Sequence, residues 1–316
     1  MSEILNRSAP GSESADPGPP ARHVRSGAAA QKTRARRLFI LPLGLLLGVL
    51  TIIPTAYILI VSFTNAASTN RSTGFVWFKN YIDMFSDPNY WAVTLRTVAF
   101  VCFAVVLQLA IGLGVAVATN GLRRGGSVVR ALILLPMAAA PIATYFNWQQ
   151  LLNASYGPID YLLRAVGLPA PDWLGQVNLA LPTLVVVDTW QWTPFVFIIL
   201  AGGLATIPND LLEAASVDGA SGWQRFTRIT VPLLLPYIAV AVLFRAIDAL
   251  KTFDSIQILT SGGPGSSTIM MNYSIYQQGI SFLQFGKASA SAVVFLIICT
   301  LLANILLRGL TRAEKK

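Results

Sequence analysis

Long apolar runs separated by short polar segments dominate the pattern of this chain. Six of these runs are each long enough to cross the hydrocarbon core of a bilayer, which takes about 20 residues of helix. A helix satisfies its own backbone hydrogen bonds in lipid, so the pattern predicts an all-α integral membrane protein with six transmembrane helices. The predicted spans are 38–63, 97–119, 131–152, 179–207, 231–260 and 288–307.

The two ends of the chain are polar and lie outside these spans. Residues 1–37 are rich in Ser, Pro, Ala and Gly and end in a basic cluster, which is typical of a disordered basic tail. The uncharged run that follows has 26 residues. It is longer than the roughly 7–15 apolar residues of a signal peptide, so a membrane span is favoured. The expected domains are a cytoplasmic tail 1–37, a transmembrane domain 38–310 and a cytoplasmic tail 311–316.

Composition narrows the class further. Hydrophobic residues make up 54% of the chain and charged residues only 12%, whereas soluble domains carry about 25% charged residues. The only histidine, His23, lies in the polar tail, so no histidine-based zinc site or Ser-His-Asp triad is expected. No Gly-x4-Gly-Lys-Ser/Thr run is present for nucleotide phosphates. We therefore expect no metal or cofactor on this chain, no enzymatic activity and no nucleic-acid surface.

The distribution of Lys and Arg predicts the orientation in the membrane. With a cytoplasmic N-terminus, sixteen of these residues fall on the inside and five on the outside. The remaining two, Arg245 and Lys251, lie within the fifth run. Because cytoplasmic loops are enriched in Lys and Arg, both termini are expected in the cytoplasm.

The most informative segment is the inside loop 208–236, between the fourth and fifth spans. Leu211, Leu212 and Ala215 give a short helix an apolar patch at one-turn spacing. Gly219 tolerates the left-handed backbone that ends such a helix. A second short segment then leads into the next span. The loop is thus expected to be a short helix-turn-helix that presents small and apolar residues to another surface.

This loop resembles the EAA loop of binding-protein-dependent ABC importer permeases. The residues that carry the resemblance are Glu213, Ala214, Ala215, Asp218, Gly219, Ala220, Phe226, Ile229, Pro232 and Pro236. Two further stretches, 188–195 and 244–265, resemble the sugar-importer branch of maltose and glycerol-phosphate permeases. The resemblance covers roughly residues 38–310. It implies the type I ABC importer permease (MetI-like) fold.

The resemblance also implies a role for the loop. In these importers the EAA segment is a coupling helix that docks into a separate ATPase subunit. Glu213 would then orient the loop or pair with a basic group, and Gly219 would supply its turn. The alternative is an amphipathic helix that lies on lipid headgroups. The residues expected to couple to the ATPase are Leu212, Glu213, Ala214, Ala215, Asp218 and Gly219.

Ionisable residues inside the apolar runs are the other candidates for function. Each costs about 2.5–3.5 kcal/mol in a membrane, so such groups pair with one another or line a cavity. Asp188 lies in the fourth run, and Arg245, Asp248, Lys251 and Asp254 lie in the fifth. Along one straight helix Asp254 would point away from Arg245. Either Arg245 and Asp248 face the pathway while Lys251 and Asp254 pair elsewhere, or all four are structural ion pairs.

Known sugar-importer permeases hold their substrate midway across the membrane, between the spans that flank the EAA loop. Carboxylates and amides exchange hydrogen bonds with hydroxyl groups, and an indole face stacks on sugar C–H groups. Weaker candidates, equally suited to hydrogen bonds between helices, are Gln108, Asn147 and Gln149. The residues expected to line the substrate pathway are Asp188, Gln191, Trp192, Arg245, Asp248 and Thr252.

The resulting hypothesis is a permease subunit of an ATP-driven importer for a sugar or polyol, in a bacterial cytoplasmic (inner) membrane. Its expected partners are a second permease, two ABC ATPase subunits that hold ATP and Mg²⁺, an extracytoplasmic solute-binding protein and membrane lipid. The alternative is an ion-coupled secondary transporter that uses Asp188 and Asp248. A membrane enzyme acting on lipid-linked sugars ranks last, because the chain offers no convincing acid–base pair.

Overall fold

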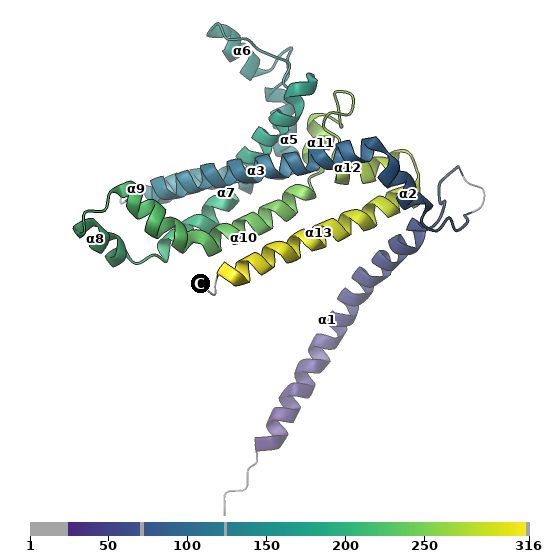
Figure 1. Ribbon diagram of the computed structural model, residues 1–316, viewed down its shortest axis with the longest axis horizontal. Coiled ribbons are helices and arrows are strands. Elements are labelled where there is room, and N and C mark those ends of the chain that lie inside the picture. The colour runs from purple at the N-terminus through teal and green to yellow at the C-terminus, as the bar shows by residue number, and fades with distance from the viewer. Residues whose placement is uncertain (1–24, 70–72, 123–124, 314–316) are drawn as a thin grey trace, which may run out of the picture. The chain divides into compact units, whose positions relative to one another are not determined.

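The computed structural model describes residues 25–69, 73–122 and 125–313, and the regular elements within these ranges are helices (Figure 1). An isolated bridge between Thr64 and Phe75 is the one β-type pairing among the described residues. In chain order the helices are α1 (Arg25–Ser62), α2 (Lys79–Ser86), α3 (Pro88–Asn120), α4 (Gly126–Ala138), α5 (Pro141–Leu151), α6 (Pro158–Ala165), α7 (Val177–Ala205), α8 (Asn209–Val217), α9 (Gly222–Arg225), α10 (Val231–Leu250), α11 (Asp254–Leu259), α12 (Met271–Tyr276) and α13 (Phe285–Ala313). Two π-helical turns, Phe226–Thr230 and Gln277–Ser281, follow α9 and α12.

The chain divides within α1 into two units, residues 1–55 and 56–316. The helix of the first unit begins at Arg25, so residues 25–37, assigned to the tail from sequence, are helical. Residues 1–24 lie outside the described part. From Leu41 to Thr55 none of the side chains is buried, as suits an apolar helix that faces lipid or another subunit.

Within the described residues, five helices are long and apolar enough to cross a membrane, and the pair α4 and α5 supplies a sixth span if it is counted as one (Figure 1). The prediction of an all-helical protein with six spans is therefore confirmed. The short helix α2 lies between the first two spans, in a polar segment rich in aromatic residues.

The third span is not one continuous helix. α4 and α5 meet at an angle of 91° after a break at Ala139 and Ala140, both of which have extended backbone. Pro141 opens α5 and disfavours helical backbone at the residue before it. The prediction of a single continuous helix over 131–152 is therefore wrong.

The fifth span also ends earlier than expected. α10 stops at Leu250, and residues 251–253 separate it from α11. The prediction of one helix over 231–260 is therefore wrong. The opposed directions inferred for Arg245 and Asp254 do not apply, because these residues lie on different helices.

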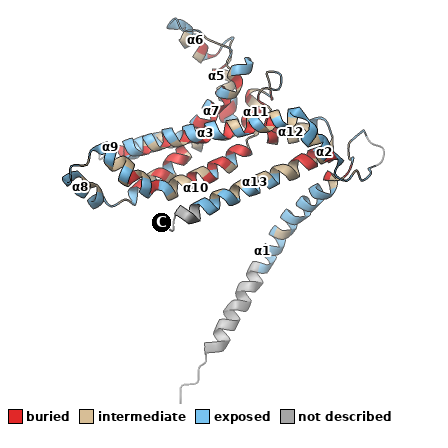
Figure 2. Cartoon of the chain, viewed as in Figure 1, coloured by how far each residue is buried: buried red, intermediate tan, exposed pale blue. Residues whose placement is uncertain are grey.

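The core of the second unit lies where α3, α7 and α10 pack together, and Figure 2 shows its buried residues along these helices. Small residues allow the close approach. A Cβ added at Gly112 of α3 would lie 2.9 Å from Val196 Cγ1 of α7. At Gly203 of α7, an added Cβ would lie 2.6 Å from the ring of Tyr237 on α10. In lipid there is no hydrophobic driving force between helices, so close van der Waals packing of this kind holds them together.

Candidate functional site

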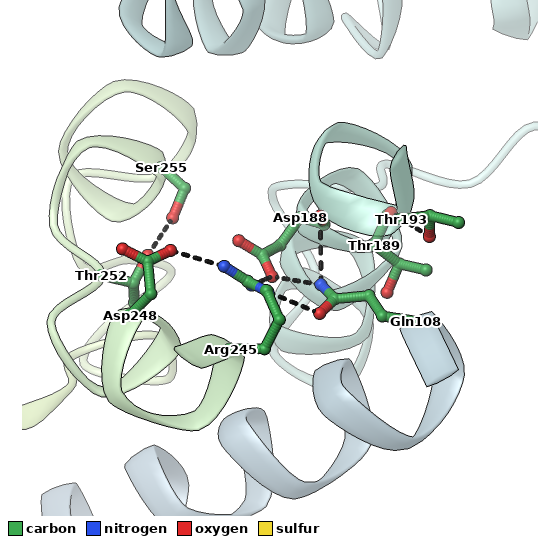
Figure 3. Close-up of polar contacts among 8 residues, drawn as sticks. All are labelled: Gln108, Asp188, Thr189, Thr193, Arg245, Asp248, Thr252 and Ser255. Carbon is green, nitrogen blue, oxygen red and sulfur yellow. Dashed lines mark hydrogen bonds and ion pairs between the residues drawn. The ribbon is translucent and has the colours of Figure 1, made fainter. Parts of the chain in front are cut away.

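A buried arginine joins the three central helices. Arg245 of α10 is 2% exposed, and its guanidinium donates three hydrogen bonds (Figure 3). Nε donates to Gln108 Oε1 of α3 at 2.8 Å, and Nη2 donates to Asp188 Oδ2 of α7 at 2.9 Å. Nη1 donates to Asp248 Oδ2, one turn along α10, at 2.5 Å. Each edge of the guanidinium is thus engaged.

Two further contacts complete this network. Gln108 Nε2 donates to the same Asp188 oxygen at 2.9 Å, so the amide bonds both members of the ion pair. The guanidinium carbon of Arg245 lies 5.0 Å from the centre of the Trp192 ring, within cation–π range. A buried ion pair needs such additional hydrogen bonds to offset the loss of hydration. The sequence identified Gln108 only as a weak candidate.

The two carboxylates bound to Arg245 differ in exposure. The side chain of Asp188 is 3% exposed, whereas that of Asp248 is 49% exposed. No ion pair joins Lys251 to Asp254 among the described residues, so the expected pairing of these two residues is wrong. The alternative was that all four charged residues of the fifth run form ion pairs, and of these four only Arg245 and Asp248 do so among the described residues.

A cavity of about 130 Å³ opens beside this network. It lies beside the breaks of both interrupted spans, because its wall includes the first turn of α5 and residues on either side of the break between α10 and α11. Four of the expected pathway residues line it: Asp188, Trp192, Asp248 and Thr252. The other lining residues are Pro141, Tyr145, Lys251, Phe253 and Asp254.

The remaining candidates lie elsewhere. Arg245 is behind the wall of the cavity, and Gln191 is fully buried, with its Nε2 at 3.5 Å from the Ala139 carbonyl at the α4–α5 break. Gln149 donates to the Ile258 carbonyl at 2.5 Å and so joins α5 to α11. Asn147 is exposed on α5. Gln191 and Gln149 thus connect helices and a break beside the cavity.

Sequence reasoning missed two aromatic residues of the cavity, Tyr145 and Phe253. Tyr145 is 4% exposed and follows the bend by one turn, and Phe253 lies in the break before α11. Both become neighbours of Asp188 only through the interruption of their spans. The proline at 141 was the one available signal, and it did not distinguish a sharp bend from an ordinary membrane helix.

The second candidate site is the loop at the other end of α7. α8 ends at Val217, and Gly219, two residues further on, has a φ of 82°, the left-handed backbone predicted from sequence. Ala220 N–H donates to the Ala215 carbonyl at 2.9 Å, and Gly219 N–H donates to Ser216 at 3.1 Å. This pair of bonds is a Schellman motif, which satisfies carbonyls at the end of a helix.

The expected coupling residues are open to solvent in this chain. α8 has no buried residue; Glu213, Ala214, Asp218 and Gly219 are exposed, and Leu212 and Ala215 are half-buried. Glu213 forms no ion pair among the described residues.

Hydrogen bonds at the start of α9 hold the loop. α9 begins with a capping box in which Ser221 and Gln224 bond each other's backbone N–H groups, and Arg225 donates to the Leu212 carbonyl at 3.4 Å. The loop is therefore held rigidly while its outer face stays uncovered.

Comparison with known proteins identifies the family. Residues 110–315 match the model of the binding-protein-dependent transport system inner membrane component. The chain belongs to this family. The resemblance drawn from the EAA loop is thereby confirmed, and this membership favours an ABC importer permease over an ion-coupled secondary transporter.

Permeases of several transport systems are similar over most of their length. The trehalose/maltose transport system permease protein of Thermococcus litoralis is 36% identical, over 83% of this chain and 88% of its own. The sulfoquinovosyl glycerol transport system permease protein of Agrobacterium fabrum is 35% identical, over 86% and 88%. The sn-glycerol-3-phosphate transport system permease protein of Brucella abortus is 33% identical, over 78% and 84%.

Solved structures agree on the fold. A chain of a bacterial ABC transporter involved in the import of the acidic polysaccharide alginate superposes with a TM-score of 0.76 at 20% identity, over 90% of this chain and 98% of that one. A chain of the MetNI methionine ABC transporter gives a TM-score of 0.52, over 72% and 99%. The expected type I importer permease (MetI-like) fold is confirmed.

Proposed function

We propose that this permease forms half of the translocation pathway for a sugar or polyol, and that the cavity beside Asp188 and Asp248 holds the solute. The observation that carries the proposal is the cavity itself, which combines carboxylates, a hydroxyl and aromatic faces at the breaks of two spans. Such side chains accept hydrogen bonds from hydroxyl groups and stack against sugar rings. The printed names of the similar permeases, for trehalose/maltose and for two glycerol derivatives, support this class.

The loop around α8 would transmit the energy of ATP hydrolysis from a separate subunit. Its open apolar patch at Leu211 and Leu212, with small Ala215 beside it, suits close contact with another protein. The Schellman motif at Gly219 and the capping box at Ser221 make the loop stiff enough to transmit a force. A helix on lipid headgroups would need more basic residues than this loop has.

The assembled importer would contain a second permease, two ATPase subunits that bind ATP and Mg²⁺, and a solute-binding protein on the outer face. This chain would translocate solute without catalysing a reaction or binding a cofactor. Both of its termini would lie in the cytoplasm, with α8 and α9 on the same side.

Uptake into proteoliposomes tests this function. The complete transporter should accumulate radiolabelled trehalose or maltose only with ATP and the solute-binding protein, and an uncoupler should have no effect. Uptake that proceeds without ATP and stops on collapse of the proton gradient would show that the permease is a secondary transporter instead.

A further inference from the structure

The charges that line the cavity are unequal in number. Three carboxylates face it, those of Asp188, Asp248 and Asp254, against one ammonium group, that of Lys251. The nearby Arg245 does not line the cavity. With the charge of Arg245 included, because it pairs with Asp188 and Asp248, the five ionised groups sum to −1, so the wall that a solute meets carries an excess of negative charge.

Arg245 is also unable to serve as an anion-binding group. Proteins recognise phosphate, sulfonate and carboxylate groups with the donor fork of arginine. Here all three guanidinium nitrogens already donate to Gln108, Asp188 and Asp248, and the side chain is 2% exposed. Its remaining N–H groups belong to a side chain that does not line the cavity, so an anion in the cavity would have to displace one of these carboxylates to reach them.

Uncharged hydroxyl groups suit the same wall. Oδ1 of Asp188 and Oδ1 of Asp248 accept no hydrogen bond from the described residues, since the bonds to both carboxylates end on Oδ2 (Figure 3). Carboxylate oxygens accept hydrogen bonds from hydroxyls, and Trp192, Tyr145 and Phe253 add aromatic surface. The cavity thus offers acceptors and ring faces to a solute that carries donors.

We propose that this pathway selects uncharged polyhydroxylated solutes and disfavours sugars that carry phosphate, sulfonate or carboxylate groups. The inference rests on the function proposed above and narrows its substrate class. Similar permeases are named for the neutral trehalose/maltose and for the anionic sn-glycerol 3-phosphate, at 36% and 33% identity, so identity does not separate the two classes. We use the charge of the cavity wall to separate neutral from anionic solutes.

Charged thiol reagents measure this charge directly. A Thr252→Cys variant, with Cys102 and Cys299 replaced by Ala, is assembled with its partner subunits in nanodiscs. The cationic reagent 2-(trimethylammonium)ethyl methanethiosulfonate should react about tenfold faster than the anionic 2-sulfonatoethyl reagent, because two unit charges of opposite sign meet the same field. Rates are normalised to those at Tyr161→Cys, a site 74% exposed on α6.

Matched charge changes locate the effect. Asp254→Lys, added to the cavity cysteine, should abolish or invert the preference, since Asp254 takes part in no ion pair of the described residues. Asp83→Lys on α2, the same change outside the cavity, should leave the preference as it was. A normalised ratio near one, or faster reaction of the anionic reagent in the parent, overturns the proposal.

Protection by solutes gives the second measurement. Trehalose and trehalose 6-phosphate are the probes, with uncharged methyl methanethiosulfonate as the reagent and no solute-binding protein present. Trehalose should slow modification of Thr252→Cys, and trehalose 6-phosphate at the same concentration should not. Equal or stronger protection by the phosphate, or none by either probe, contradicts the inference. ATP-dependent uptake by the parent transporter, reconstituted into proteoliposomes with the solute-binding protein, tests the proposed function separately.

Discussion

Among single residues, the two carboxylates bound to Arg245 differ in burial, so their loss should differ in cost. Asp188→Asn leaves the guanidinium in a buried site with its main counter-charge removed, and breaking such a pair costs about 3–5 kcal/mol. Asp248→Asn removes a half-exposed partner, for which about 1 kcal/mol is expected. We expect Asp188→Asn to lower the melting temperature of the detergent-solubilised complex much more than Asp248→Asn does.

A double variant controls for a general effect of substituting α7. Asp188→Leu with Arg245→Met removes both charges, so no uncompensated ion remains, and much of the lost stability should return. Equal losses for the two asparagine variants, or no recovery in the double variant, would show that the network does not hold the three helices together.

The sequence could identify the charges of this network but not its hydrogen bonds. Asp188 and Arg245 are conspicuous because an ion inside an apolar run is costly and needs a partner. Gln108 is not conspicuous, since an amide in a membrane helix finds partners on any neighbouring helix. Its place between Arg245 and Asp188 depends on the rotation of α3 against α7 and α10, which is set by packing across the core.

At the scale of a whole element, the backbone conformation at the end of α8 provides the test of the coupling role. A β-branched residue at Gly219 must adopt a φ near 82°, which costs L-residues about 1–2 kcal/mol. Space is not limiting, because an added Cβ would meet no atom within 4 Å. We therefore expect Gly219→Val to reduce co-purification of the ATPase subunit and ATP-coupled uptake at least several-fold, with normal membrane insertion.

Asparagine is the matched replacement at this position. It tolerates the left-handed backbone, so Gly219→Asn should retain most of the ATPase binding and uptake. If Gly219→Val binds the ATPase and transports as the parent does, α8 is not the coupling element.

The spans themselves were predictable, but two of their shapes were not. Length and hydropathy decide whether a run crosses the membrane, so all six were found. The break at 251–253 contains neither Gly nor Pro, and the polar residues there were compatible with a continuous helix. It arises because α11 packs against α5 and α7, a tertiary contact that local sequence does not encode.

Over the whole second unit, the turn before α12 and the loop that carries α8 and α9 lie at opposite ends of α3 (Figure 1). At the start of α3, Arg96 donates to the carbonyls of Ser266 and Ile269, and so holds the Gly-rich turn before α12. At its other end, Asn120 lines a cavity of about 220 Å³ with Gly222 and Arg225 of α9. Because α3 has 33 residues, its two ends are far enough apart to reach opposite faces of a membrane.

Labelling of single cysteines therefore decides the topology on which the coupling proposal depends. In a chain lacking its native cysteines, Ser266→Cys should react with a membrane-impermeant maleimide in intact cells, because the turn faces outward. Val217→Cys, at a position 88% exposed on α8, should react only after the membrane is permeabilised. The excess of Lys and Arg in the segments expected inside gives the physical reason for this orientation. Labelling of Val217→Cys from outside would place α8 beyond the reach of any cytoplasmic ATPase, and the loop would then need another role.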